Sequence, residues 1–419
     1  MTNRRNPGFD CRFDPNLSSR TPYKVNAPPI VSVADASFRR IFGAEPSLRS
    51  FAPGRVEILG NHTDYNEGLV LGVAIDRHTA VVGRCVEGTK ATIHAAAFGE
   101  TDTIELAEPN VDPGPEGRWT RYVLGVHWAL RGKFDSPLGF EAVIAGDVPL
   151  GAGLSSSASL QASFGLFLNA LHGVKIPDDD ARLELARRLR KAENGFVGVA
   201  SGLLDFVTVL FGRPGHAVFL DCRTLEIRRP SLGETPPAIV VLDSRTSRQL
   251  ADGMYNIRRT ECERIVDQFR KIKGTNAIAS LRDITPEELS AHWKYLDLVG
   301  RTRARHVLLE NIRVADGVAA LEAGDLEKLG LLMSRSHKSS RSDFGNSSDA
   351  LDALVAAALT APGCLGAKLS GAGWAGCVVA LVRPGQLDDF VQAAISGYRN
   401  ETDTEADVTV AYASGCSDS

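Results

Sequence analysis

The stretch GDVPLGAGLSSSASL, residues 146–160, carries the strongest structural signal in this chain of 419 residues. Pro149 and two glycines, Gly151 and Gly153, interrupt an apolar strand, and three serines then lead into a helix-forming pattern. Such a loop points unpaired N–H groups and the positive end of a helix dipole at one place, which suits an anion. The hydroxyls of Ser155–Ser157 can cap the helix, bind phosphate oxygens or bind a metal. The loop has no GKS or GKT, which excludes a P-loop, and a plain capped turn remains the alternative.

The size and composition of the chain place it among globular proteins of two domains, with 43% hydrophobic and 23% charged residues. A net charge of −4 gives no electrostatic reason to expect nucleic acid or an anionic membrane as a partner. Seven cysteines without paired spacing predict reduced thiols, and no stretch resembles a signal peptide or a membrane span. We therefore expect a soluble, cytoplasmic protein. That it is a monomer is a separate expectation.

Strand-like and helix-like segments alternate along the first half of the chain, and long helices dominate the second. Strands are expected at 69–75, 79–85, 140–144, 217–220, 238–243, 376–381 and 408–413, and helices at 158–171, at 179–193 and between 244 and about 359. The turn-rich stretch RRPSLGETPP, residues 228–237, predicts a domain boundary. The pattern indicates an α+β fold in both halves. We expect an extension at 1–27, a first domain at 28–235 and a second domain at 236–419.

A second glycine-rich loop, GAKLSGAGWAGC, spans residues 366–377. Glycines at 371, 373 and 376 indicate a close approach of the backbone, either to a ligand or to another segment of the chain. By itself this signal does not choose between the two.

Two acids, Glu193 and Asp205, stand in the otherwise apolar stretch KAENGFVGVASGLLDFVTVLFG, residues 191–212. A carboxylate in such surroundings needs a cation or a hydrogen-bond donor to remain charged. Arg55 is the expected partner of Asp205. The pair can belong to an active site or can be a structural ion pair.

These loops, together with GRVEILGNHTDYNEGLVLGVAID at residues 54–76, resemble the three signature motifs of the GHMP small-molecule kinases. The stretch at residues 54–76 resembles the first motif of the galactokinase branch, whose usual core is GEHTDY. PLGAGLSSSASL resembles the family's ATP-phosphate loop, and KLSGAGWAGC resembles its C-terminal glycine motif. The segments YNIRRTECE (255–263), RARHVLLE (303–310) and SHKSSRSDFGNSS (336–348) are also similar to galactokinase segments, so the resemblance runs from about residue 45 to the end.

The resemblance implies a two-domain GHMP kinase fold: an N-terminal ribosomal-S5-like domain, a C-terminal α+β domain and an active site between them. It implies ATP-dependent phosphorylation of the anomeric hydroxyl of a hexose, galactose first, with Mg²⁺. Asp205 would lie beside that hydroxyl, and Arg55 would stabilise the transferring phosphoryl. The implied sugar contacts are Asn61, His62, Thr63, Asp64, Gly202 and Tyr255. The implied ATP contacts are Gly151, Ala152, Gly153, Leu154, Ser155, Ser156 and Ser157, and the implied metal ligands are Ser157 and Glu193.

Several positions depart from the family pattern. Asn61 replaces the usual glutamate that contacts the sugar's 6-hydroxyl, Ser201 a cysteine, Phe206 a glutamine, and Trp374–Ala375 an aromatic–glycine pair. An amide at 61 can bind a 6-hydroxyl or tolerate a 6-carboxylate, which leaves galacturonate as an alternative substrate. A catalytically inactive sugar-sensing regulator is a second alternative. A mevalonate or homoserine kinase would not need the NHTDY segment.

Overall fold

The computed structural model describes residues 27–107, 114–115, 117–199, 201–246 and 251–417. The expected N-terminal extension, residues 1–27, therefore lies outside the described residues except for Ala27. Within the described ranges, none of the helices combines the length and the apolar character that crossing a bilayer requires.

The first half of the chain is built on a large, mostly antiparallel sheet in the order β4-β3-β5-β2-β6-β7, with β1 paired to β2. Only β3 and β5 run parallel among these described strands. The strands are β1 (Leu48–Leu59), β2 (Leu69–Val86), β3 (Lys90–Ala95), β4 (Glu100–Glu105), β5 (Gly139–Gly146), β6 (Val218–Asp221) and β7 (Ile227–Arg228).

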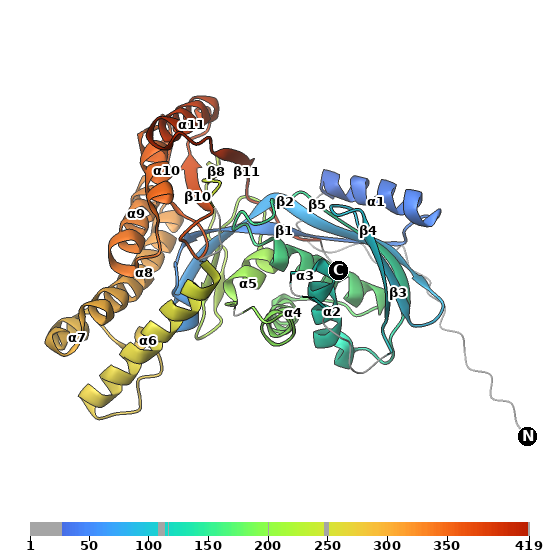
Figure 1. Ribbon diagram of the computed structural model, residues 1–419, viewed down its shortest axis with the longest axis horizontal. Helices are drawn as coiled ribbons and strands as arrows, with labels where there is room; N and C mark the ends of the chain where they lie inside the picture. Colours follow the sequence, from blue (N-terminus) through green and yellow to red (C-terminus); the bar gives the residue numbers. More distant parts are fainter. Residues whose placement is uncertain (1–26, 108–113, 116, 200, 247–250, 418–419) are drawn as a thin grey trace, which may run out of the picture.

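Helices cover both faces of this sheet (Figure 1), with α1 on one face and α2 to α5 on the other. They are α1 (Pro29–Phe42), α2 (Trp119–Leu130), α3 (Ser156–Leu171), α4 (Asp179–Ala192) and α5 (Leu204–Phe211). Successive residues of a strand point to opposite faces, so Ala80 and Val82 pack under α1, whereas Val81 joins the core under α3. Burial on both faces explains why these strands read as continuous apolar runs.

The strand β2 differs from the expectation of two strands at 69–75 and 79–85, because it is one strand of 18 residues. Residues 76–78 contain no glycine or proline to turn the chain. Instead the pairing of β1 with β2 shifts register between Pro53 and Gly54, and the chain continues through a bulge.

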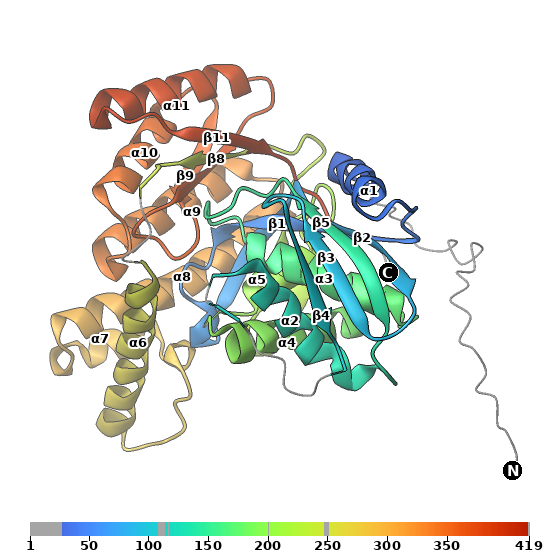
Figure 2. The ribbon, with the colours of Figure 1, turned by 45° about the vertical axis from the view of Figure 1, so that its right-hand side comes forward.

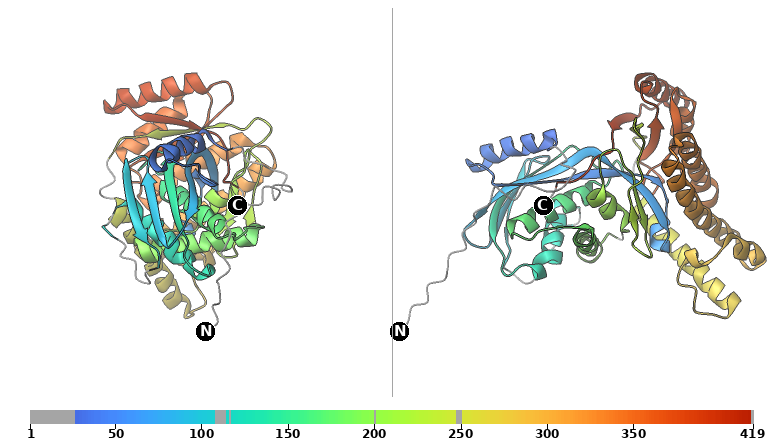
Figure 3. Two further views of the ribbon diagram at one scale, coloured as in Figure 1. Left: turned by 90° about the vertical axis from the view of Figure 1, so that its right-hand side faces the viewer. Right: turned by 180° about the vertical axis from the view of Figure 1, so that it is seen from behind.

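The second half combines a smaller antiparallel sheet, in the order β11-β8-β10-β9, with a group of helices. Its strands are β8 (Ala238–Asp243), β9 (Cys364–Leu369), β10 (Cys377–Val382) and β11 (Asp407–Ala411). Its helices are α6 (Ala251–Lys273), α7 (Pro286–Ala291), α8 (Leu298–Glu322), α9 (Leu326–Ser339), α10 (Asp349–Thr360) and α11 (Leu387–Thr402). Figure 2 and the right view of Figure 3 show α9 to α11 at the opposite end of the molecule from β3 and β4. Both halves mix helices and sheet, so the α+β expectation is confirmed.

Short helical turns complete the chain. They are 3₁₀ turns at Asp64–Asn66, Arg131–Lys133, Leu281–Asp283 and Trp293–Tyr295, and π-helical turns at Glu193–Val197 and Ser340–Phe344. Both π-helical turns follow directly on a longer helix, and such turns are frequent at functional sites.

One hydrophobic cluster joins the two halves. It contains Val56 of β1, Val241 of β8 and Val318 of α8, together with Ala152 and Leu154 of the first glycine loop. All five side chains are buried. Because the glycine loop contributes apolar side chains to this shared core, its backbone is fixed relative to both sheets.

The packing of α9 on β9 predicts a large effect of one methyl group. A Cβ at Gly330 of α9 would lie 1.9 Å from the carbonyl oxygen of Leu365, which neither backbone can accommodate without moving. We expect Gly330→Ala to lower the free energy of unfolding by about 2–3 kcal/mol, because the added methyl group overpacks this contact. Urea denaturation measures this change. Gly253→Ala is the matched control, because a Cβ there meets nothing within 4 Å. It should leave stability equal or up to about 1 kcal/mol higher, and equal losses in both variants would contradict the close packing.

Candidate active site

The loop of residues 60–68, here called the sugar loop, follows β1 and is held by helix α8. The backbone N–H groups of Gly60 and Asn61 both donate to the Glu310 carboxylate, at 2.9 and 3.3 Å. His306 Nε2 donates to the Asn61 carbonyl at 3.0 Å. Arg313 also donates to Glu310 at 2.5 Å. Burial opposes the charge of Glu310, but Arg313 and the other cations outweigh it and lower the pKa of that carboxyl to about 2.

The first three polar residues of the sugar loop use their side chains within the protein. The Asn61 amide contacts Glu57 and Gly371, as described below, and it is almost completely buried. Thr63 Oγ1 lies 2.8 Å from the carbonyl oxygen of Gly60 and 2.7 Å from that of Leu69. These contacts leave Asn61 and Thr63 to shape the loop.

His62 also has a partner for each ring nitrogen. Its Nε2 lies 2.9 Å from the Ala372 carbonyl and its Nδ1 lies 2.9 Å from the Tyr65 hydroxyl. Burial lowers the pKa of His62 to about 3, so the ring is neutral at pH 7. The neutral ring therefore donates from Nε2 and accepts at Nδ1. His62 has a φ of 61°, a strained conformation for a residue with a side chain.

Asp64, Gly202 and Tyr255 come together from three distant parts of the sequence. A Cβ at Gly202 would lie 1.6 Å from a carboxylate oxygen of Asp64, so only glycine fits against this acid. Burial raises the pKa of Tyr255, and the nearby carboxylates of Asp64 and Asp205 raise it further. The ring of Tyr255 packs 5.3 Å from that of His62. The structure thus brings the remaining implied sugar contacts to one place.

Asp205, at the start of α5, is paired with Arg55 as the sequence analysis expected. Arg55 Nε and Nη2 lie 2.7 and 2.6 Å from Asp205 Oδ1, and the Ser155 hydroxyl donates to Oδ2 at 2.6 Å. Arg55 Nη1 also donates to the Gly153 carbonyl at 2.7 Å. The Asp205 side chain keeps 25% of its surface exposed, whereas Arg55 is buried. One side of this carboxylate therefore remains accessible.

The first glycine loop, residues 151–155, leads into α3 as predicted. Gly151, Gly153 and Ser155 all have positive φ, of 75°, 73° and 55°. Ser155 occupies the N-cap position of α3, but its hydroxyl bonds to Asp205 and not to the helix backbone. The helix N-terminus consequently keeps N–H groups without a side-chain cap, which suits an anion.

Glu193 and Ser157 lie next to each other although 36 positions separate them in the sequence. The amide nitrogen Nε2 of Gln161 donates a hydrogen bond to the Glu193 carboxylate at 3.0 Å. Burial raises the pKa of Glu193, the Ser201 and Ser157 hydroxyls oppose the rise, and the charge of Asp205 adds to it. The Glu193 carboxylate is therefore buried against the first turn of α3, where Ser157 is partly buried.

The second glycine loop, residues 370–376, packs against the rest of the site. A Cβ at Gly373 would lie 2.0 Å from the carbonyl oxygen of Asn346, and one at Gly371 would lie 4.0 Å from the Gly153 backbone. The Asn346 carbonyl accepts a hydrogen bond from the N–H of Trp374 at 2.7 Å. Of the two explanations left open by the sequence, close approach to another chain segment is therefore confirmed for Gly373.

Sequence reasoning missed several polar residues that build the site: Glu57, His306, Glu310 and Lys368. Glu57 and Lys368 are buried in apolar strands, and they form an ion pair of 2.8 Å. The rule that singled out Asp205, a charge in apolar surroundings, applies equally to both. His306 and Glu310 are one helical turn apart in RARHVLLE, a spacing that places both on one face of α8.

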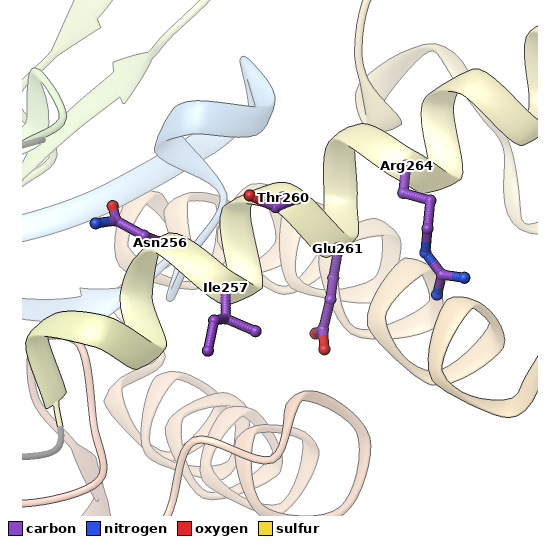
Figure 4. Close-up of a pocket in the computed structure, with 5 residues that line it drawn as sticks. All are labelled: Asn256, Ile257, Thr260, Glu261 and Arg264. Atoms are coloured by element: carbon purple, nitrogen blue, oxygen red, sulfur yellow. The ribbon is translucent and has the colours of Figure 1, made fainter.

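Two surface depressions lie elsewhere, on the helical half. One of about 300 Å³ runs along α6 and is lined by Asn256, Ile257, Thr260, Glu261 and Arg264 (Figure 4). The other, of about 510 Å³, is lined by Pro286, Leu289, Ser290, Trp293, Arg305, Leu308 and Leu309. Neither contains an implied site residue.

Comparison with known protein families matches three parts of the chain. Residues 36–85 match the galactokinase galactose-binding signature, residues 121–213 the GHMP kinases N terminal domain, and residues 318–400 the GHMP kinases C terminal domain. These matches cover the sugar loop, the first glycine loop with Asp205, and the second glycine loop.

Relatives of known name agree with this assignment. The chain is 39% identical over 384 residues to a galactokinase of Roseiflexus sp. strain RS-1, a match that covers 90% of this chain and 94% of the relative. It is 38% identical to the galactokinase of Homo sapiens, over 84% of this chain and 88% of the relative. The solved structure of Lactococcus lactis galactokinase complexed with galactose superposes with a TM-score of 0.85, 32% identity and coverage of 93% and 100%.

The fold and the three motifs thus define a two-domain kinase of the GHMP class, an enzyme that uses ATP. The chain belongs to the galactokinase family.

The pKa of Asp64 predicts a measurable cost of burying this acid in the candidate site. Burial is the main cause that raises this pKa from 3.8 to about 6, and the charges of Glu57 and Asp205 add to it. The folded chain therefore keeps a proton that the unfolded chain has lost between pH 4 and 6, so stability falls as pH rises through this window. Asp64→Asn should raise the free energy of unfolding by about 3 kcal/mol at pH 7.5 and by less than about 1 kcal/mol at pH 4.

Asp221 provides the control of opposite sign. Burial opposes its charge, but hydrogen bonds from Arg282 outweigh burial and lower the pKa of Asp221 to about 2. Its stabilisation is present above pH 4 and is lost as pH falls towards 2, so Asp221→Asn should lower stability at pH 7.5. Denaturation of the three proteins at both pH values measures this. A loss of stability in Asp64→Asn at pH 7.5 would show that Asp64 stabilises the fold.

Proposed function

We propose that this protein transfers the γ-phosphoryl group of ATP to the anomeric hydroxyl of galactose and forms galactose 1-phosphate. The main support is the Asp205 carboxylate, held by Arg55 and Ser155 at the N-terminus of α3 and partly open on one side. The arrangement brings a proton acceptor, a cation and a phosphate-type loop together. The names of the relatives and their coverage of the chain agree with it.

Asp205 orients the anomeric hydroxyl and accepts its hydrogen bond. Each carboxylate oxygen has two acceptor positions, so the bonds from Arg55 and Ser155 leave capacity for the substrate. Arg55 holds the Asp205 carboxylate by two contacts and also lies beside Gly153 of the first glycine loop, where its charge stabilises the transferring phosphoryl group. Catalysis comes mainly from positioning and electrostatics.

The ATP phosphates bind the backbone of the first glycine loop. The side chains of Ala152 and Leu154 are buried in the shared core, so these two residues can offer only their backbone groups. The uncapped N–H groups at the start of α3 face the same place. The proposed contacts are Gly151, Ala152, Gly153, Leu154, Ser155, Ser156 and Ser157.

Ser157 and Glu193 fit a Mg²⁺ ion. Hydroxyl and carboxylate oxygens are the ligands that hard cations prefer. Gln161 Oε1 is buried beside them without a hydrogen-bond partner, and the raised pKa of Glu193 marks a carboxylate that would gain from a cation. When bound, Mg²⁺ supplies charge neutralisation at the phosphoryl group.

The charges around the sugar loop favour galactose over galacturonate. Asp64, Asp205 and Glu57 lie close enough for the last two to raise the pKa of the first. Two neighbouring cations are already paired, Arg55 with Asp205 and Lys368 with Glu57. A third, Arg190, partly offsets these acids at Asp64. The pKa of Asp64 stays raised in spite of Arg190, so a substrate carboxylate beside Asp64 would also be disfavoured by burial and by the neighbouring acids, which disfavours a hexuronate.

A coupled ADP-release assay tests this function on galactose, galacturonate, glucose, N-acetylgalactosamine and arabinose. We expect kcat/KM for galactose to exceed that for galacturonate at least tenfold, which corresponds to about 1.4 kcal/mol. Asp205→Asn is the control for the site, and it should lose nearly all turnover while still binding ATP. Preference for galacturonate, or full activity in Asp205→Asn, would contradict the proposal.

Glu193→Gln tests the metal site. An amide oxygen is a weaker ligand for a hard cation than a carboxylate, so half-maximal activity should need roughly tenfold more Mg²⁺. Glu184→Gln is the matched control, because Glu184 lies on helix α4, which leads into the turn of Glu193, and forms a partly exposed pair with Arg188. An identical Mg²⁺ titration in wild type and Glu193→Gln would show that Glu193 is structural.

A further inference from the structure

Lys368 is a completely buried cation in β9, and its ion pair crosses between the two halves of the molecule. Its ammonium group lies 2.8 Å from Glu57 Oε1 on β1, and Glu57 is 5% exposed. A buried cation needs one carboxylate to balance it. Glu57 meets that need four residues before Asn61, the position at which the resemblance implies an acid.

Asn61 donates to the same carboxylate oxygen. Its Nδ2 lies 3.1 Å from Glu57 Oε1 and 2.8 Å from the Gly371 carbonyl. Its Oδ1 accepts from Asn346 at 2.8 Å and from Ser340 at 3.3 Å. An amide has two donor hydrogens and two acceptor positions, so all four are used inside the protein.

We propose that Asn61 is a positioning residue that ties the sugar loop to the second glycine loop, and that Glu57, Asn61 and Lys368 form a unit with room for one negative charge. The side chain at position 61 then does not contact the C6 substituent of the sugar. The inference rests on the proposed function only where galactose is used as the substrate in a test.

Two features make the amide necessary. Gly371 offers a carbonyl and Glu57 a carboxylate, which only accept, so residue 61 must donate to both. An acid at 61 would also place two carboxylates within hydrogen-bond distance beside a single lysine. The bond to Gly371 should affect ATP binding, because Gly371 lies next to Gly153 of the first glycine loop.

A double-mutant cycle of near-isosteric changes separates the charge from the donor. Asn61→Asp adds a second carboxylate to this unit and Glu57→Gln removes the one that the unit holds, so each should lower Tm by at least 5 °C. The double variant Glu57→Gln/Asn61→Asp carries one carboxylate again, so its Tm should return to within about 2 °C of wild type. Glu45→Gln, in the exposed pair with Arg39, is the matched control and should not change Tm.

The Kd for ATP, measured by titration calorimetry, tests the hydrogen bond that residue 61 donates to Gly371. It should rise at least threefold in Asn61→Asp and stay raised in the double variant, because an aspartate cannot donate to Gly371. Glu57→Gln alone should leave it within twofold of wild type. Should Asn61→Asp fail to fold while the double variant folds, the charge part of the proposal is supported directly.

Three outcomes would overturn the inference. They are additive losses of Tm in the double variant, failure of the double variant to fold, and a change confined to the galactose KM in Asn61→Asp, which would make Asn61 a sugar ligand. The Tm and ATP measurements need no turnover. A wild type that does not phosphorylate galactose would therefore refute the proposed function without deciding this cycle.

Discussion

The arrangement of the site depends on the buried guanidinium group of Arg55. A buried charge is tolerated only with close partners, and Arg55 has them in Asp205 of α5 and the carbonyl of Gly153. Its backbone N–H also donates to the carbonyl of Leu154. Strand, helix and loop are thus fixed at hydrogen-bond distances from one residue. The hydrophobic core beneath, which includes Val56 and Leu154, keeps them there.

Around this ion pair the molecule collects groups that are unfavourable for folding. Burial raises the pKa of Asp64 and of Glu193, and His62 and Ser155 adopt left-handed backbone conformations. Strain and buried acids of this kind concentrate at functional sites, because the surrounding packing holds them in place for a ligand. Substrate hydroxyls and a cation are the groups that would relieve these acids.

Much of the site was accessible from the sequence, because short motifs carry local geometry. The glycines and serines at 151–157 predicted a phosphate-type loop before a helix, and the helix begins at Ser156. An acid in apolar surroundings needs a cation, and from this rule Arg55 was the expected partner of Asp205. Local patterns failed where contacts are long-range. The break expected between residues 75 and 79 is a bulge, because the register with β1 decides it.

The sequence by itself determined the family, the α+β class and the order of the three motifs, since these depend on residue types at fixed local spacings. Only the tertiary structure decided what Asn61 does. Its partners Glu57, Ser340, Asn346 and Gly371 are up to 310 positions away along the chain. The acceptors that folding places around a hydrogen-bond donor decide which bonds the donor forms. A sequence motif shows the donor but not those acceptors, because they come from distant segments.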